Sequence, residues 1–178
     1  MKRTFTLLAT CIFGVLAASQ AFATTPNIVF ISDFGLADDS VSQCKAVILD
    51  VAPETHVIDM THGVVPYDIR FAAFLLADSA GYWPPGTVFL AVVDPGVGTD
   101  RKRVAIKTKS GRYFVGPDNG IFSIVARLHG IEKAVYIENM KYARTSVSST
   151  FEGRDVFAPV AAWLIRDPAV FDRLGPVV

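Results

Sequence analysis

The stretch Asp94-Pro95-Gly96-Val97-Gly98-Thr99-Asp100-Arg101 follows an unbroken apolar run, Val88-Phe89-Leu90-Ala91-Val92-Val93. Such a run is typical of a strand buried on both faces of a parallel sheet, so Asp94 is predicted where this strand leaves the carboxyl edge. Open α/β sheets bind ligands at that edge. Pro95 restricts the backbone, whereas Gly96 and Gly98 permit positive φ and the close approach of a ligand.

The same loop returns Arg101 toward Asp94, so a carboxylate and a guanidinium are expected around one concave spot. A tight turn closed by a surface ion pair explains the stretch equally well.

Strand-like runs alternate with segments of helical period along the rest of the chain. The expected strands are 27–32, 56–60, 88–93, 103–108, 112–115 and 133–138, the fourth and fifth joined as a hairpin around Ser110-Gly111. Helices are expected after the loop 33–38, from Pro66 and Asp68, from the turn 116–120, and from the segment 150–155. This alternation predicts an α/β fold, a three-layer α/β/α sandwich with a mostly parallel, mixed central sheet.

The first 23 residues have the organisation of a Sec-type signal peptide. Lys2 and Arg3 precede the apolar stretch 5–18, and Ala21-Phe22-Ala23 is an A-x-A cleavage site. The prediction is a mature chain that begins at Thr24 and is exported to the periplasm or the medium. A membrane anchor is the alternative, but the apolar stretch is shorter than the ~20 residues that span a bilayer. A lipoprotein is a further alternative, disfavoured because Cys11 lies inside the apolar stretch.

Removal of residues 1–23 leaves 155 residues, enough for one domain with a substantial core. The mature chain has 15 basic and 17 acidic residues, a formal charge of −2, so no nucleic-acid or membrane partner is expected. Cys44 is the one cysteine left, which excludes an intramolecular disulfide, and its place on an apolar helix face predicts packing as a small hydrophobe.

Several familiar sites are missing from the sequence. The loop after Asp94 lacks the Lys-Ser or Lys-Thr of a Walker motif, and neither G-x-G-x-x-G after the first strand nor G-x-S-x-G occurs. His56, His62 and His129 lack metal-ligand spacing, so no metal is predicted.

Carboxylates and hydroxyls at strand ends are the remaining candidates. Asp33, like Asp94, follows a strand, and a carboxylate there could accept hydrogen bonds from two hydroxyls of a sugar such as ribose. Asp38 and Ser40 follow in the same loop, where helix capping is an equal alternative. Asp33, Asp94 and Glu152 are predicted to lie near a common cleft.

Five stretches in order resemble the S-adenosylmethionine (SAM) hydrolase family, the SAM hydroxide adenosyltransferases, which are related to the fluorinase and chlorinase. They are Ser32 to Gly35, Asp38 to Lys45, Val93 to Thr99 with Arg101, Gly116 to Gly120, and Thr150-Phe151 with Gly153 to Pro159. The resemblance implies an α/β/α N-terminal domain followed by a smaller β-barrel, a homotrimer with sites between subunits, and no cofactor. The implied reaction is attack of water on ribose C5′ of SAM, which gives adenosine and L-methionine.

By position, Asp94 and Arg101 match the Asp and Arg of the hydrolases' Asp-Arg-His triad. The resemblance places the ribose-binding Asp on Asp33, a pocket aromatic on Tyr67, and contacts to the methionine end near Asp38 and Ser40. Halogenases have Tyr-Pro-Ala-Thr-Gly where this chain has Asp94 to Gly98, and a hydroxyl residue in place of Gly153, so hydrolysis is favoured over halogenation.

The chain departs from the family in two respects. Glu152 occupies the position of the triad histidine and adds a negative charge near Asp94, which tends to raise one carboxylate's pKa. The expected domain spans 24–172, and 173–178 has the composition of a truncated interdomain linker without the β-barrel behind it.

The sequence predicts a hydrolase in which Arg101 orients a water, Asp94 polarises it and Glu152 stands in for histidine. It also predicts that Glu152 slows the enzyme and that Glu152→His accelerates it. The alternative is a residual nucleoside- or SAM-binding domain without catalysis.

Overall fold

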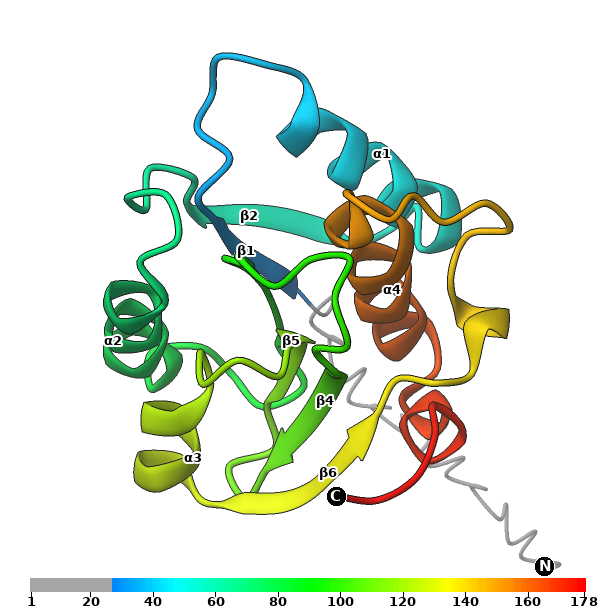
Figure 1. Cartoon of the computed structure of the whole chain (residues 1–178). Helices are drawn as coiled ribbons and strands as arrows, with labels where there is room; N and C mark the ends of the chain where they lie inside the picture. The colour runs from blue at the N-terminus through cyan, green and yellow to red at the C-terminus, as the bar shows by residue number, and fades with distance from the viewer. Residues whose placement is uncertain (1–26) are drawn as a thin grey trace, which may run out of the picture.

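A computed structural model describes residues 27–178, which form a six-stranded sheet between two layers of helices (Figure 1). The strands are β1 (Asn27–Ser32), β2 (His56–Thr61), β3 (Val88–Val92), β4 (Arg103–Thr108), β5 (Tyr113–Pro117) and β6 (Ile131–Tyr136). Their order across the sheet is β2-β1-β3-β5-β4-β6. The predicted signal peptide and its cleavage site lie outside the described residues.

Five of the six strands run in one direction. β1 pairs in parallel with β2 and β3, and β3 pairs in parallel with β5. β4 is antiparallel to both β5 and β6. The mostly parallel, mixed sheet is therefore confirmed, and so is the hairpin between β4 and β5.

Two helices cover each face of the sheet. α1 (Ser40–Val51) and α4 (Ala158–Arg166) pack together on one face, and α2 (Ile69–Ala80) and α3 (Ser123–His129) on the other (Figure 1). Along β3, Leu90 and Val92 join the first core, while Phe89 and Ala91 join the second. All five residues of β3 are buried, because parallel strands at the centre of such a sheet have helices on both sides. The three-layer sandwich is confirmed.

The largest differences from the boundaries predicted by the sequence lie at three places. Gly116 and Pro117 belong to β5, where they pair with Val104 and Arg103, so α3 begins only at Ser123. β6 lies two residues earlier than expected, since its register is set by pairing with β4. The last helix is preceded by a π-helical turn, η2 (Gly153–Phe157), and Pro159 lies in the first turn of α4, where no backbone donor is needed.

Short 3-10 helices, η1 (Met140–Tyr142) and η3 (Pro168–Arg173), complete the fold. The residues after η3 run antiparallel to β6, with hydrogen bonds from Tyr136 N–H to Pro176 O and from Val178 N–H to Ala134 O. Cys44 is fully buried on α1, and burial raises the pKa of its thiol to about 12. Within residues 27–178, no helix has the length and apolarity needed to cross a membrane.

Candidate functional site

A cavity of about 360 Å³ opens where β1 and β3 end at the carboxyl edge of the sheet. Asp33 directly follows β1, Asp94 is the second residue after β3, and Glu152 lies just before η2. All three line this cavity, together with Phe34, Pro66, Tyr67, Val92, Val97, Thr150, Phe151 and Gly153. The expected gathering of Asp33, Asp94 and Glu152 at one cleft is therefore what the structure has, because parallel strands bring their following loops to the same edge.

The loop 94–101 is a pair of tight turns. Val97 N–H donates to Asp94 O at 3.3 Å and Thr99 N–H donates to Gly96 O at 3.1 Å. Both glycines permit positive φ, but only Gly98 adopts it, with φ of 78°. Gly96 contributes its N–H, which donates to Asp94 Oδ1 at 3.2 Å. The turns aim Arg101 back at Asp94.

The side chains of Asp94, Arg101, Glu152 and Arg103 form one ionic network, which we call the carboxylate–arginine cluster. Arg101 Nε donates to Asp94 Oδ1 at 3.1 Å, and Nη2 donates both to Asp94 Oδ2 and, at 2.6 Å, to Glu152 Oε2. Arg103 Nε donates to Glu152 Oε1 at 2.9 Å, and its Nη2 contacts the same oxygen. Asp94, Arg101 and Glu152 have side chains less than one-tenth exposed. The ion pair is therefore buried, and the alternative of a surface pair is excluded.

Burial and charge act differently on the two carboxylates. Burial raises the pKa of Asp94, and the charge and hydrogen bonds of Arg101 offset only part of that effect. Burial opposes ionisation of Glu152 too, but hydrogen bonds from Arg103 and Arg101 outweigh it and hold the pKa of Glu152 below its usual range. The environment thus shifts the pKa of Asp94 toward proton binding and the pKa of Glu152 away from it, and a raised pKa suits a proton acceptor.

Asp94 and Glu152 line the cavity, whereas Arg101, which contacts both of them, does not. Its Nη1 donates to Lys102 O at 3.0 Å, so every nitrogen of the guanidinium has a protein partner. Arg101 therefore holds Asp94 and Glu152 together, and its expected role in orienting a water stays a prediction.

Asp155 anchors the segment that carries Glu152. Its buried carboxylate accepts from Ser148 N–H at 2.8 Å and from Arg154 Nε at 2.7 Å. Burial would raise the pKa of Asp155, but these hydrogen bonds and the charge of Arg154 bring it below the usual range. Arg154 also donates to Gln43 on α1 at 2.7 Å, which ties the segment to the helix layer. A π-helical turn, common at functional sites, then begins at Gly153.

Gly153 is enclosed by the cavity wall. A Cβ atom there would lie 3.0 Å from Val92 Cγ1 and 3.1 Å from Phe34 Cζ. A hydroxyl residue at this position would require both neighbours to shift.

Asp33 and Tyr67 meet at the outer side of the cavity. Tyr67 N–H donates to Asp33 Oδ2 at 2.8 Å, and Tyr67 is the one described non-glycine residue with positive φ, 69°. Such backbone strain in a non-glycine residue is concentrated at binding sites. Oδ1 of Asp33 has no hydrogen-bond partner among residues 27–178, and it stays available to a ligand.

A second chain of hydrogen bonds lies behind Asp33. Ser32 Oγ and His62 Nδ1 are 2.7 Å apart, His62 Nε2 and Asp59 Oδ1 are 3.0 Å apart, and Lys45 Nζ donates to Asp59 Oδ2 at 2.6 Å. Ser32 and His62 are buried, so Ser32 cannot reach a substrate. These hydrogen bonds instead connect the end of β1 to the end of β2. Gly35 N–H, which donates to His62 O at 2.8 Å, adds a backbone contact between the loops that follow these strands.

Asp38 and Ser40 do not line the cavity. Asp38 Oδ1 accepts from Ser40 N–H at 2.9 Å just before α1, but the N-cap residue of this helix is Asp39, which has no side-chain cap hydrogen bond. The hydrogen bond from Ser40 lowers the pKa of Asp38. Their contact with a methionine group stays a prediction.

The sequence did not indicate a role for Arg103 or for the aromatic pair Phe34 and Phe151 in the cavity wall. Phe34 and Phe151 meet edge to face, with ring centroids 5.6 Å apart, and both belong to stretches that carry the family resemblance. Arg103 follows Arg101 by two residues at the start of β4, and the extra carboxylate at position 152 was the signal that a second cation was needed. Within residues 27–178 no group of three or more His, Cys, Asp or Glu side chains could hold a metal ion.

Two proteins of related sequence and one solved structure resemble this chain. An (R)-S-adenosyl-L-methionine hydrolase of Salinispora tropica is 46% identical over 157 residues, 88% of this chain and 59% of that protein. A fluorinase of Actinoplanes sp. is 30% identical over 161 residues, 78% of this chain and 54% of that protein. A solved structure of an uncharacterized conserved protein from Thermotoga maritima has a TM-score of 0.82 at 43% identity, covering 85% of this chain and 58% of that one.

The chain thus spans less than 60% of the length of each of these proteins. The family model of the SAM hydroxide adenosyltransferase N-terminal domain matches residues 28–175, which cover the elements from β1 to η3 except Asn27, the first residue of β1. This chain therefore belongs to the SAM hydroxide adenosyltransferase family and contains its N-terminal domain.

Proposed function

We propose that this protein hydrolyses SAM to adenosine and L-methionine. The observation that carries the proposal is the convergence of Asp33, Asp94 and Glu152 on one cavity. Relatives such as the Salinispora tropica protein are named SAM hydrolases, and they share with this chain the region that forms the cavity.

In this proposal Asp33 binds the ribose hydroxyls. Tyr67 N–H occupies Oδ2 and orients the carboxylate, and an ionised carboxylate oxygen accepts about two hydrogen bonds. The ring of Tyr67, which is two-thirds exposed at the rim, would cover the bound nucleoside. Asp38 and Ser40 are proposed to reach the methionine end of the substrate from the start of α1.

The reaction needs a water molecule held against C5′. The oxygen of that water forms the new bond to C5′, the C5′–sulfur bond breaks, and its electron pair leaves with sulfur as the neutral thioether of methionine. Asp94 accepts the proton, since Oδ2 has one donor and so one remaining acceptor position. The sulfonium is already a good leaving group, so the protein mainly positions and desolvates the water.

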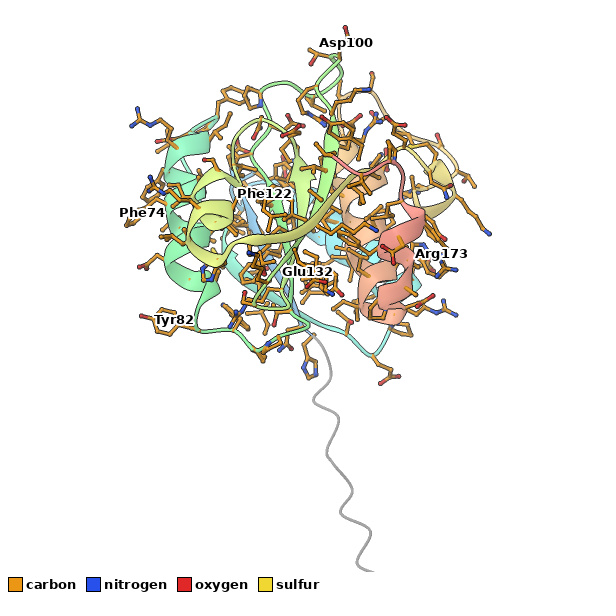
Figure 2. All side chains as sticks on the ribbon, turned by 90° about the horizontal axis from the view of Figure 1, so that it is seen from below. Phe74, Tyr82, Asp100, Phe122, Glu132 and Arg173 are labelled. Atoms are coloured by element: carbon orange, nitrogen blue, oxygen red, sulfur yellow. The ribbon has the colours of Figure 1, made fainter. Side chains whose placement is uncertain are left out.

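Incubation of residues 24–178 with SAM, followed by chromatography for adenosine and methionine, tests the function. Both products should appear in equal amounts, and Asp94→Ala should abolish them. Asp100→Ala is the matched control, because Asp100 lies in the same loop with its side chain at the outer tip, pointing away from the body (Figure 2). Binding of adenosine without any turnover of SAM would instead favour the non-catalytic nucleoside-binding domain.

We also propose that the protein is exported and that it acts as a homotrimer. The sequence of residues 1–23 supports export, and N-terminal sequencing of secreted protein should return Thr24. Phe71 and Phe74 on α2 are about half exposed, and Phe74 points outward from the helix (Figure 2). A subunit contact that covers these rings would show in light scattering as three times the chain mass.

A further inference from the structure

Arg103 is a cation of the carboxylate–arginine cluster that does not line the cavity. It is the first residue of β4, and its side chain is 31% exposed, against 7% for Glu152. Its outer side faces a separate surface depression that Arg101, Lys102 and Tyr136 also line. Arg103 therefore cannot touch a substrate in the cavity, and any influence on the reaction must pass through Glu152.

The two oxygens of Glu152 are divided between two arginines. Oε1 accepts from Arg103, at 2.9 Å from Nε, while Oε2 accepts from Arg101 at 2.6 Å. This division fixes the plane of the carboxylate. It also leaves Nη2 of Arg101 between Glu152 Oε2 and Asp94 Oδ2, so that one guanidinium group is held by both carboxylates.

The four side chains alternate in charge, Asp94, Arg101, Glu152 and Arg103, so their formal charges cancel. Without Arg103, two buried carboxylates would share the single guanidinium of Arg101, and one of them would tend to take up a proton. Among the described residues, Arg101 and Arg103 are the cations that contact Glu152. Lys102 is directed to Glu138, 3.7 Å away, and Arg154 to Asp155, so neither replaces Arg103.

We propose that Arg103 is a positioning residue of the reaction centre, which acts through Glu152 to keep Arg101 and Asp94 in their relative placement and the cluster neutral. This inference rests on the proposed function for its kinetic consequences. The contacts and charges on which it depends are independent of the substrate.

The test compares Arg103→Met, Glu152→Gln, the double variant and Arg103→Lys with the wild-type protein. Arg103→Met should lower kcat for SAM roughly tenfold or more with KM changed by no more than about twofold, since the residue does not meet the substrate. It should also move the acid limb of the kcat profile to higher pH. The double variant should recover part of the lost kcat, because removal of both charges restores neutrality, and Arg103→Lys should recover most of it.

Lys107→Met is the matched control. Lys107 lies on the same strand, its side chain is also 31% exposed, and it pairs with Glu132 at 2.6 Å far from the cavity. This variant should leave kcat and its pH dependence unchanged. A similar loss in Lys107→Met and Arg103→Met would show a general effect on β4 and would overturn the inference.

A second measurement works without turnover. The chemical shifts of the Glu152 and Asp94 carboxyl carbons can be followed against pH by NMR. The pKa of Glu152 should rise in Arg103→Met and should not change in Lys107→Met. If wild type forms no adenosine, the proposed function fails while this titration still decides the role of Arg103. An unchanged titration, or a double variant whose kcat is the product of the two single effects, would leave Arg103 as an ordinary structural ion pair.

Discussion

Gly98 lies so close to the carbonyl oxygen of Ser149 that a Cβ atom at position 98 would stand 2.6 Å from it. This contact joins the loop that carries Asp94 and Arg101 to the segment that carries Glu152. Gly98→Ala should therefore separate the two segments and break the bond between Arg101 and Glu152. We expect loss of SAM hydrolysis and a fall in the free energy of unfolding, measured by urea denaturation.

Gly86→Ala is the control for this prediction. Gly86 has φ of 87°, similar to the 78° of Gly98, but nothing lies within 4 Å of a Cβ built there. Gly86→Ala should cost only the left-handed conformation, about 1–2 kcal/mol, and should leave activity unchanged. Equal stability losses in the two variants would mean that the contact with Ser149 has no energetic weight.

The raised pKa of Asp94 predicts where activity is lost in acid. If Asp94 accepts the proton of the attacking water, kcat should fall as pH falls through a pKa above the ordinary aspartate value. Glu152, whose pKa is lowered, stays ionised over that window. A kcat profile between about pH 3 and pH 8 measures this limb, and an inflection at or below the pKa of an exposed aspartate would contradict the assignment.

The pKa shifts of Asp94 and Glu152 have opposite effects on how the free energy of unfolding depends on pH. Because the folded-state pKa of Glu152 is lowered, its contribution is present above the unfolded-state value and is lost as pH falls through the folded value. Because that of Asp94 is raised, its contribution is present in acid and is lost as pH rises through the folded value. Denaturation midpoints of Asp94→Asn and Glu152→Gln against pH should therefore diverge from wild type in opposite directions.

The bond between Ser32 and His62 predicts a binding effect from a residue that no ligand touches. Ser32→Ala removes the 2.7 Å contact behind Asp33 and leaves His62 Nδ1 without its partner in a buried site. We expect a loss of about 1–3 kcal/mol in stability and weaker binding of adenosine, measured by calorimetry. Ser79, near the C-terminal end of α2, accepts from Trp83 Nε1 and does not line the cavity, so Ser79→Ala should leave adenosine affinity intact. Unchanged affinity in Ser32→Ala would show that Asp33 needs no such support.

The contact between Arg103 and Glu152 changes the expected effect of Glu152→His on kcat. The sequence alone predicts a faster enzyme, because histidine removes a charge beside Asp94. In the structure that substitution also removes the acceptor of Arg103, so the cluster would become net positive next to a cationic sulfonium. We now expect Glu152→His alone to be slower than wild type and the gain in kcat to need Arg103→Met as well. Kinetics of the two variants with SAM decide this, and a single variant faster than wild type would restore the original expectation.

The sequence by itself determined the layers, the direction of most strands and the edge at which the cavity lies. Apolar runs and helical periods are local properties, and a strand followed by a helix places its following loop at the carboxyl edge of a parallel sheet. Asp33 and Asp94 could therefore be predicted to face a common cleft from their positions after β1 and β3 alone.

Only the tertiary structure decided the partners of these side chains. Glu152 and Arg103 are separated by 49 residues, and the sequence has no local pattern that joins a residue before η2 to the start of β4. The positive φ of Tyr67 and the burial of Ser32 against His62 likewise depend on how the loops after β1 and β2 pack. Periodicity fixes which face of an element is buried, but the charge balance of a buried cluster depends on side chains that meet only when distant loops close on one another.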